Sequence, residues 1–167
     1  VLVPWKRTRA WGEKIVQKLD SHYLICRLGF PYRAQFPQKK DFVRAILARL
    51  QNNEEAKAVF DQIFTPTFID DIAWALDILI KKQAVGIYHM VGSESLTPYE
   101  AARLIAQIFG FPENLVQKIG ANGYFANRAP RPFKLILTND KIRKLGVEMA
   151  TFEEGLKIIK TQLITHN

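Results

Sequence analysis

The run Gly86–Gly92 does most to constrain the fold, because it is apolar over nearly its whole length. Its sequence is Gly-Ile-Tyr-His-Met-Val-Gly, and such a short, continuous apolar segment bounded by glycines predicts a strand. A strand of this kind suits a sheet that is covered on both faces, as in α/β proteins. His89 lies inside the run, where a histidine is more often a hydrogen-bonded core residue than a catalytic one. We therefore expect an α/β fold with His89 in a structural role.

Local patterns predict the remaining elements. A second strand is expected at Tyr23–Arg27, before the break made by Gly29 and Pro31. Apolar residues at helical spacing and favourable capping residues predict about six helices. These helices are expected at Trp5–Leu19, Asp41–Leu50, Asp70–Leu79, Pro98–Phe109, Asn139–Leu145 and Phe152–Leu163, with capping residues Asp70, Thr97, Thr138 and Thr151. We expect Leu115–Phe125 to be a connection with turns, so the sheet is depleted.

Charge and composition exclude several classes of protein. The chain has 24 Lys and Arg against 16 Asp and Glu, which gives a net charge of +8. The basic residues form small groups rather than a long stripe, so we expect no specific nucleic-acid binding, while a diphosphate-bearing small molecule remains compatible. Cys26 is the single cysteine, which excludes an intrachain disulfide and a cysteine-based metal cluster. We predict no metal site, no membrane span and a cytoplasmic protein.

The stretch Asp61–Leu79 carries a recognisable motif. An Asp61-Gln62 pair is followed by Pro66-Thr67, by Phe68 and by the acidic pair Asp70-Asp71 at a helix start. This stretch resembles the segment after the substrate loop in the dTDP-4-dehydrorhamnose reductase family, which are extended short-chain dehydrogenases that act on nucleotide sugars. Other stretches resemble the same family in the same order: Leu24–Tyr32, Asp41–Val43, Gly86–Gly92, Thr97–Ala101, Asp140–Gly146 and Thr151–Leu156.

The resemblance covers only the C-terminal half of such a protein. It implies the last Rossmann strands and helices plus the small substrate-binding domain, with an incomplete sheet. Residues 1–32 and 83–92 would be the Rossmann elements, and residues 33–82 and 93–167 mostly the substrate-binding portion and covering helices. The glycine-rich loop that holds a dinucleotide does not occur in the sequence. The resemblance implies NADP or NAD as the cofactor of the complete protein. Because this loop is absent, we expect no cofactor on this chain alone.

The segment Trp5–Glu13 resembles the catalytic helix of the family, which carries Tyr-x-x-x-Lys and then Gly-Glu. In the family, the tyrosine donates a proton to the reacting carbonyl, and the lysine lowers the tyrosine pKa and holds the nicotinamide ribose. Here Trp5 and Arg9 occupy those two positions. An indole N–H cannot serve as that acid, and arginine does not readily lose its proton. Both catalytic positions are therefore substituted.

The resemblance also assigns binding residues. Phe30 falls where the family places an aromatic residue near the sugar, and Phe42 falls in the motif that opens the next helix. Arg128 and Arg131 match an Arg-Pro element that faces the nucleotide-sugar pocket, and a guanidinium suits a diphosphate because it can bond two oxygens at once. Arg9 and Gly29 are the positions expected to contact the cofactor.

Two functions follow from these observations. The first is the substrate-binding half of an NAD(P)-dependent nucleotide-sugar reductase that reduces a 4-keto sugar, as in dTDP-rhamnose biosynthesis. The second is a non-catalytic relative that acts as a regulatory subunit, like that of methionine adenosyltransferase. The substituted Trp5 and Arg9 favour the second function, and the sugar-pocket motifs favour the first. The expected partners are a nucleotide sugar and either a second copy of the chain or an N-terminal half.

Overall fold

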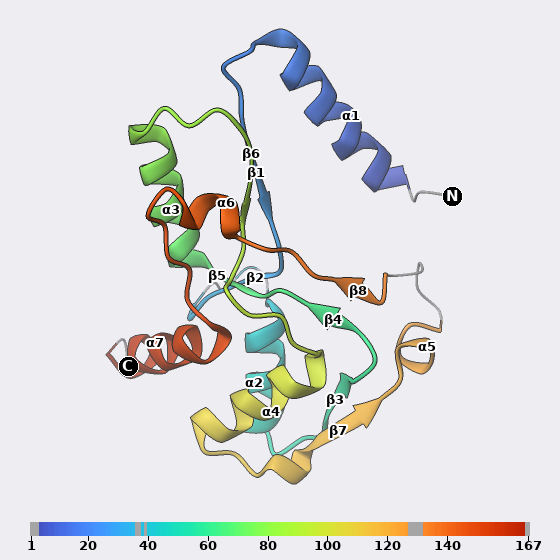
Figure 1. The fold of residues 1–167 in the computed structure, drawn as a ribbon. Helices are drawn as coiled ribbons and strands as arrows, with labels where there is room; N and C mark the ends of the chain where they lie inside the picture. The colour runs from blue at the N-terminus through green and yellow to red at the C-terminus, as the bar shows by residue number, and fades with distance from the viewer. Residues whose placement is uncertain (1–3, 36–37, 39, 127–131, 166–167) are drawn as a thin grey trace.

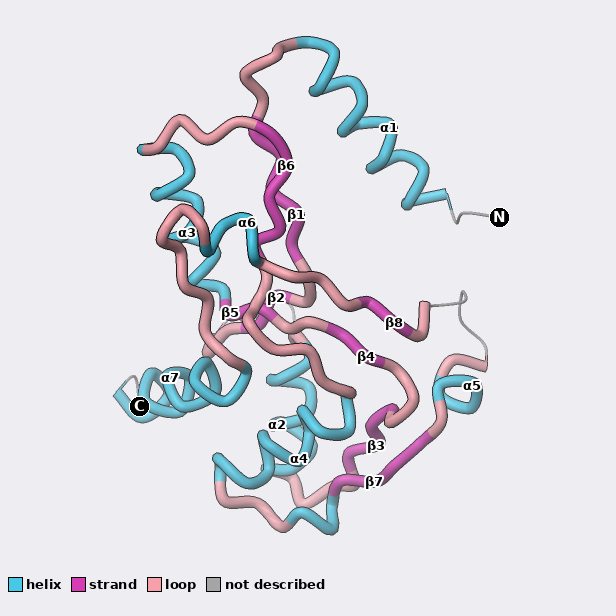
Figure 2. Tube along the Cα trace, viewed as in Figure 1, coloured by secondary structure: helices cyan, strands magenta, loops and turns pink. Residues whose placement is uncertain are grey.

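The chain alternates between helices and short strands. The computed structural model describes residues 4–35, 38, 40–126 and 132–165 (Figures 1 and 2). The helices are α1 (Pro4–Leu19), α2 (Phe42–Gln51), α3 (Ile69–Lys81), α4 (Pro98–Phe109), α5 (Ala121–Tyr124), α6 (Asp140–Arg143) and α7 (Phe152–Thr165), with a 3₁₀ turn at Glu113–Leu115. The strands are β1 (Leu24–Leu28), β2 (Pro31–Tyr32), β3 (Ala56–Val59), β4 (Ile63–Phe64), β5 (Thr67–Phe68), β6 (Gly86–Met90), β7 (Val116–Ile119) and β8 (Lys134–Leu135).

The strands pair in parallel across long stretches of sequence. Within the described residues they form four two-stranded sheets, β1–β6, β2–β5, β3–β7 and β4–β8. The pair β1–β6 runs from Leu24 opposite Gly86 to Leu28 opposite Met90. Parallel pairing requires crossover connections, and α3 lies in the one that joins β1 to β6. The expected α/β fold with an incomplete sheet is confirmed.

Buried apolar residues gather in two cores. The larger one packs α2, α4 and α7 around β2, β3 and β5, with Tyr32, Leu50, Ile105 and Phe152 among its fully enclosed members. The smaller one lies between the β1–β6 pair and the helices α3 and α6 (Figure 1). The predicted division of the chain into Rossmann and substrate-binding segments is not tested by these contacts and stays a prediction.

The segment around Thr67 joins the two cores. The Thr67 hydroxyl is fully buried, donates to the Gly29 carbonyl at 2.6 Å and accepts from the Gly92 N–H at 3.3 Å. Gly92 passes so close to this segment that a Cβ atom there would collide with the Pro66 carbonyl oxygen. The ends of β1 and β6 are therefore held against β5 by one side chain and by a glycine that allows the approach.

The sequence patterns predict only β1 and β6 as strands, and β3 and β7 are the longest of the others. No strand is predicted over Ala56–Val59, and a connection is predicted over Leu115–Phe125, yet β3 and β7 lie in these stretches and pair in register. Neither strand is a continuous apolar run, because exposed polar residues interrupt both of them, namely Lys57 in β3 and Gln117 and Lys118 in β7. Their strand character comes from pairing with each other and from packing on α4, which no local pattern contains.

The start of α3 also differs from its prediction. The helix begins at Ile69, and Phe68 rather than Asp70 is its N-cap, without a side-chain hydrogen bond. Asp70 instead accepts from Gln162 Nε2 at 3.0 Å, and Asp71 accepts from the Ala150 N–H at 2.8 Å. Both carboxylates still lie in the first turn, where the helix dipole favours them, but their partners come from the far end of the chain.

The N-cap of the short helix α6 lies one residue later than predicted. Asn139, not Thr138, is the N-cap of α6, and its amide bonds the Val91 carbonyl instead of the helix. The capping box at Thr97 and Glu100 is present, and Gly110 ends α4 in the left-handed conformation with φ of 79°. Thr151 and Glu154 bond each other in the same reciprocal way. Both predicted capping boxes are confirmed.

Replacing Thr67 by valine should strongly destabilise the fold. Valine has nearly the same shape but no hydroxyl, so a buried carbonyl at Gly29 and a buried N–H at Gly92 would lose their partner. We expect a loss of about 2–4 kcal/mol in the free energy of unfolding, measured by urea denaturation. Thr67→Ser keeps the hydroxyl and should lose only about 1 kcal/mol for the missing methyl group. Equal losses for both variants would contradict the role given to the hydroxyl.

Asp71 should make stability depend on pH. Burial raises the pKa of the Asp71 carboxyl in the folded protein, against the lowering effect of the Ala150 N–H, and the nearby Asp70 and Glu154 raise it further. A raised folded pKa means that this group stabilises the fold at low pH and that the contribution is lost as pH rises through the folded pKa. Asp71→Asn keeps an oxygen for Ala150 but cannot ionise.

The measurement is urea denaturation of both proteins between about pH 3 and pH 7, across the ordinary Asp pKa. The stability of Asp71→Asn relative to the unchanged protein should rise as the pH rises. Asp77→Asn is the matched control, because Asp77 lies on the exposed side of the same helix and pairs with Lys81. A difference between Asp71→Asn and the unchanged protein that stays constant over this range would disprove the assignment.

Candidate functional site

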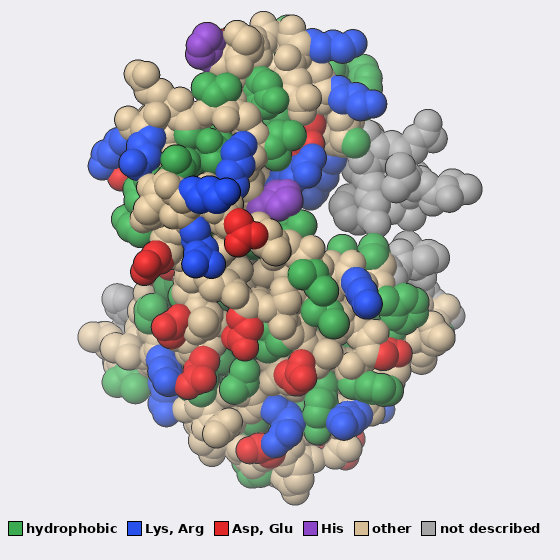
Figure 3. All heavy atoms as spheres, in the orientation of Figure 1, with side chains coloured by type: hydrophobic (Ala, Val, Ile, Leu, Met, Phe, Trp, Pro, Cys, Tyr) green, Lys and Arg blue, Asp and Glu red, His purple; other side chains and the backbone are tan. Residues whose placement is uncertain are grey.

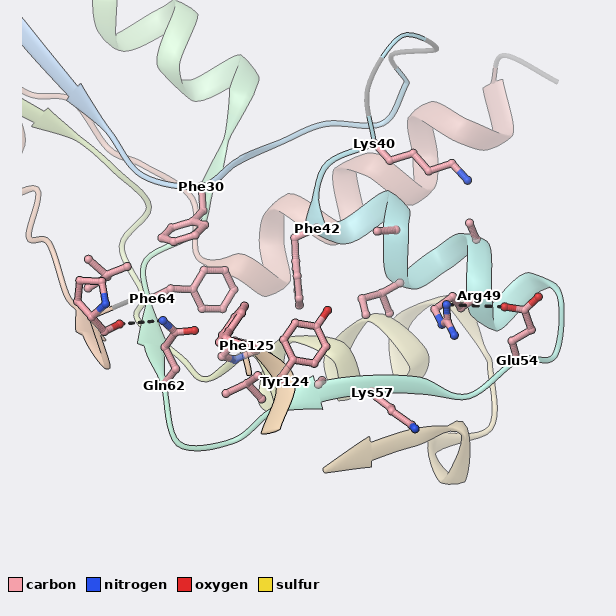
Figure 4. A pocket seen from close by; sticks show the side chains of 18 of the residues that line it. Phe30, Lys40, Phe42, Arg49, Glu54, Lys57, Gln62, Phe64, Tyr124 and Phe125 are labelled. Carbon is pink, nitrogen blue, oxygen red and sulfur yellow. Dashed lines mark hydrogen bonds and ion pairs between the residues drawn. The ribbon is translucent and has the colours of Figure 1, made fainter. Parts of the chain in front are cut away.

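A cleft of about 1030 Å³ opens between α2, β3, β4 and the segment around α5 (Figure 4). Among the residues that the structure describes, aromatic side chains from four separate stretches line it, together with three basic residues and one acidic residue. The aromatic lining consists of Phe30, Phe42, Phe64, Tyr124 and Phe125. The charged lining consists of Lys40, Arg49, Lys57 and Glu54.

Phe64 is the centre of the aromatic part. It is almost completely buried on β4, and the Phe30 ring meets it edge-on with centroids 5.0 Å apart and an interplanar angle of 84°. The Phe42 ring, at the first residue of α2, meets Phe64 from another side at 5.4 Å and 68°. Such edge-to-face pairs are the favoured arrangement of aromatic rings. Three rings from three elements thus form one apolar wall.

Phe30 is held in an unusual backbone conformation. Its φ is +44°, a left-handed value that bulky residues rarely adopt. The Phe30 carbonyl accepts from the Thr67 N–H at 3.2 Å, next to the bond between the Thr67 hydroxyl and Gly29. The ring is 43% exposed at the cleft. Residues kept in strained conformations by their surroundings concentrate at functional sites, so the conformation marks Phe30 as a candidate contact residue.

The basic residues lie at the other end of the cleft (Figure 4). Arg49 extends from the last turn of α2, donates from Nε to the Glu55 carbonyl at 2.9 Å and lies 3.9 Å from Glu54 through Nη1. Lys40 precedes α2, and Lys57 is exposed on β3. Among the described residues, Lys40 and Lys57 form no ion pair with a carboxylate, so this end carries net positive charge.

Asp61 and Gln62 fix the stretch that forms the remaining wall. Asp61 Oδ1 accepts from the Ala121 N–H at 2.8 Å, and Gln62 Nε2 donates to the Pro132 carbonyl at 2.8 Å. Tyr124 and Phe125 lie between these two points, with their rings 4.9 Å apart at 87°. The described residues of this wall are therefore tied to the main body at Ala121 and at Pro132.

A separate polar cluster lies on the β1–β6 pair. Arg27 donates to both carboxylate oxygens of Glu13 on α1, at 3.0 Å from Nε and 2.7 Å from Nη2. This double hydrogen bond holds the pKa of Glu13 below its ordinary value. Arg27 Nη1 also lies 3.4 Å from His89 Nε2, which accepts when that nitrogen carries no proton. The expected structural role of His89 agrees with this contact, although the residue is only half-buried.

The helix α1 is bound to the body through this cluster and presents much of its apolar surface to solvent. Trp11 is 68% exposed and Leu19 is 79% exposed. Figure 1 shows α1 extending away from the rest of the chain. Parallel strands such as β1 and β6 normally have helices on both faces. Here the helices α3 and α6 pack against the β1–β6 pair and share a hydrophobic core with it.

The residues expected at the site fall into three groups. Phe30 and Phe42 both line the cleft, and their contact with a substrate stays a prediction. Arg128 and Arg131 lie outside the described residues. Trp5 and Arg9 are on α1; the Arg9 side chain is exposed, and that of Trp5 is not among the described side chains.

Gly29 has a structural reason to lack a side chain. A Cβ atom there would lie 3.0 Å from the Thr65 carbonyl oxygen and 3.4 Å from Val91 Cγ1. The glycine thus allows β1 to turn tightly against β6 and the segment before β5. Its contact with a cofactor stays a prediction. Among the described side chains, no group of three or more His, Cys, Asp or Glu could hold a metal ion.

Several lining residues were not foreseen. Phe64 and Gln62 lie inside the Asp61–Leu79 motif, so their positions next to conspicuous residues were the available signal. Lys57 and Tyr124 gave no signal, because the strand and helix that carry them were not predicted. Their place at the cleft depends on the β3–β7 pairing.

Solved structures define the class of protein. A dTDP-4-dehydrorhamnose reductase from Bacillus anthracis in complex with NADP superposes with a TM-score of 0.78 at 26% identity, over 90% of this chain and 52% of that one. The fold is that of extended short-chain dehydrogenases. The sequence profile of the RmlD substrate binding domain matches residues 4–164. The chain belongs to the RmlD substrate binding domain family, which confirms the resemblance seen in the motifs.

The relatives include a polysaccharide biosynthesis protein, a reductase and a subunit of methionine adenosyltransferase. The spore coat polysaccharide biosynthesis protein SpsK of Bacillus subtilis is 26% identical over 90% of this chain and 51% of its own length. The dTDP-4-dehydrorhamnose reductase of Escherichia coli is 28% identical over 95% and 55%. Methionine adenosyltransferase 2 subunit beta of Xenopus laevis is 26% identical over 90% and 47%. The chain thus spans about half the length of these relatives.

Proposed function

We propose that this chain is the substrate-binding half of an NAD(P)-dependent reductase that acts on a 4-keto nucleotide sugar. The observation that carries the proposal is the cleft, which has an aromatic wall at one end and a positively charged rim at the other. Membership of the RmlD substrate binding domain family supports the same conclusion. The name of the E. coli relative, dTDP-4-dehydrorhamnose reductase, suggests a dTDP-linked sugar as substrate.

A nucleotide sugar has parts that match both ends of the cleft. Its base and its sugar ring present flat or apolar faces, which stack on aromatic side chains such as Phe30 and Tyr124. Its diphosphate carries negative charge, which Arg49 and Lys57 would bind through charge-assisted hydrogen bonds. Arg128 and Arg131 are proposed as further diphosphate contacts because the family motif places an arginine there.

The basic residues are better explained by such a ligand than by nucleic acid. On the face drawn in Figure 3, Lys and Arg side chains are spread among Asp and Glu side chains rather than gathered in one broad patch. A nucleic-acid surface would need several adjacent phosphate contacts. None of the described helices is long and apolar enough to cross a bilayer.

Reduction would need a nicotinamide cofactor, which supplies the hydride when it is bound to the complete protein. The residues of this chain would hold the sugar and exclude water from it, and Arg9 would contribute positive charge near the cofactor ribose. The family acid is replaced by Trp5, so the proton for the reduced carbonyl would have to come from another group. We therefore expect slow turnover.

The chain should bind dTDP without help from a cofactor-binding half. Isothermal titration calorimetry should detect dTDP binding and no binding of NADH or NADPH. Arg49→Ala and Lys57→Ala should each weaken the affinity for dTDP by about tenfold, because each removes a charge-assisted contact to the diphosphate. Lys81→Ala is the matched control, because Lys81 is exposed on α3 and pairs with Asp77.

The loss should also depend on ligand charge, so thymidine should bind with similar affinity to the unchanged protein and to both cleft variants. No heat with dTDP on the unchanged protein would disprove the proposed function. Tight stoichiometric binding of NADPH would disprove the assignment of the chain to the substrate half.

A regulatory subunit is the second candidate. It is favoured by the similarity to methionine adenosyltransferase 2 subunit beta and by the substituted positions Trp5 and Arg9. In that case, the cleft would still bind a nucleotide ligand, and the loss of the acid would not impair function because no proton transfer is needed. The two candidates are separated by asking whether restoring the acid restores turnover.

The double change Trp5→Tyr with Arg9→Lys should raise the rate of hydride transfer, once the protein is joined to a cofactor-binding half. A positioned general acid typically contributes roughly 10²–10⁴-fold, whereas cofactor affinity should change much less because Arg9 already supplies a charge. Single-turnover hydride transfer measures the rate, and fluorescence titration measures cofactor binding. Equal rates with and without the double change would favour the regulatory subunit or show that Trp5 does not occupy the acid position.

A further inference from the structure

The side chains of Asp61 and Gln62 bridge an interruption in strand pairing. β3 and β7 pair as far as Val59 opposite Ile119, and β4 and β8 resume at Ile63 opposite Lys134. Between these points, residues 60–62 lie on one side of the interruption, and Ala121 and Pro132 are among the described residues on the other. Backbone bonds close the two edges of the interruption, from the Phe60 N–H to the Ile119 carbonyl at 3.3 Å and from the Ile63 N–H to the Phe133 carbonyl at 2.8 Å.

Inside the interruption, the side chains of Asp61 and Gln62 make hydrogen bonds in place of the missing backbone pairing between strands. The Asp61 carboxylate accepts from Ala121 near the start of the long segment, and the Gln62 amide donates to Pro132 near its end. Gln62 is only 7% exposed, and its hydrogen bond to the half-buried Pro132 is partly shielded from water. Losing this donor would therefore leave a partly buried carbonyl without its partner.

The residues held in this way contribute to the lining of the cleft. Tyr124, Phe125 and Pro132 all line it, and Tyr124 and Phe125 lie near Phe42 of α2 (Figure 4). The distance between these two rings and α2 therefore depends on where Ala121, at the start of α5, is fixed. The Asp61-Gln62 pair holds Ala121 and Pro132 through adjacent residues of one turn.

We propose that Asp61 and Gln62 are positioning residues that set the width of the nucleotide-sugar cleft by holding Ala121, which precedes Tyr124 and Phe125, and Pro132, which also lines the cleft. They act through Tyr124, Phe125 and Pro132. The inference rests on the proposed function for the identity of the ligand. The positioning itself can be measured without any ligand.

Five variants, three test variants and two controls, separate positioning from general stability. Asp61→Ala removes the oxygen that accepts from Ala121, whereas Asp61→Asn keeps one. Gln62→Met keeps the size and removes the donor to Pro132. Asp77→Ala and Gln117→Met are matched controls, since Asp77 pairs with Lys81 within α3 and Gln117 donates to the nearby Asn114 carbonyl.

The first readout is amide hydrogen exchange at Ala121, followed by NMR in the absence of ligand. Exchange should become at least about tenfold faster in Asp61→Ala and stay near the unchanged rate in Asp61→Asn and in the controls. Unchanged exchange in Asp61→Ala would overturn the positioning role, whatever the ligand is.

The second readout is dTDP affinity by calorimetry, with the melting temperature recorded for each variant. Asp61→Ala and Gln62→Met should each bind dTDP about tenfold more weakly than the unchanged protein. Asp61→Asn and the two controls should bind dTDP with the affinity of the unchanged protein. A loss that follows melting temperature equally in controls and test variants would overturn the proposal. Absence of dTDP binding in the unchanged protein would refute the proposed function alone, because the exchange readout still decides the positioning.

Discussion

The buried hydroxyl of Thr67 is the interaction on which the arrangement of this fold depends. It bonds the carbonyl at the end of β1 and the N–H just after β6, so one side chain joins β5 to both strands of the longest parallel pair. Neither backbone group has water available in its place, because Thr67 is fully buried. The two cores of the molecule meet at this point, and the strained backbone of Phe30 begins one residue after Gly29.

The cleft follows from the same segment. Residues 61–68 supply Gln62 and Phe64 to its lining, Asp61 to the bond with Ala121, and Thr67 to the bond that holds the Phe30 carbonyl region. A rigid central segment can thus present a site whose other parts come from a helix and from a long connection. Binding sites are commonly built in this way, with variable segments placed on a fixed scaffold.

The proposed chemistry of the chain divides between a binding cleft and a helix with substituted catalytic positions. The cleft has aromatic and basic side chains, which in our proposal bind a nucleotide sugar. In the same proposal, α1 carries Trp5 and Arg9 at the positions of the family's acid and its partner, so different elements would provide binding and turnover. The relatives of the chain include both a dTDP-4-dehydrorhamnose reductase and methionine adenosyltransferase 2 subunit beta.

The sequence by itself determined the elements whose signals are local. The capping boxes at Thr97 and Thr151, the glycine end of α4 and the apolar run of β6 depend on contacts within a few residues, so they were predicted correctly. The ordered motifs also identified the family, and with it Phe30 and Phe42 as residues that line the cleft.

Tertiary structure decided everything that depends on pairing between distant residues. β3 and β7 are strands because they meet each other and pack on α4, although exposed Lys57 and Lys118 obscure their pattern. The true partners of Asp70 and Asp71 come from α7 and the residue before Thr151, which no local rule could supply. The aromatic wall at Tyr124 exists because Asp61 and Gln62 reach across 60 and 70 residues of sequence to hold it.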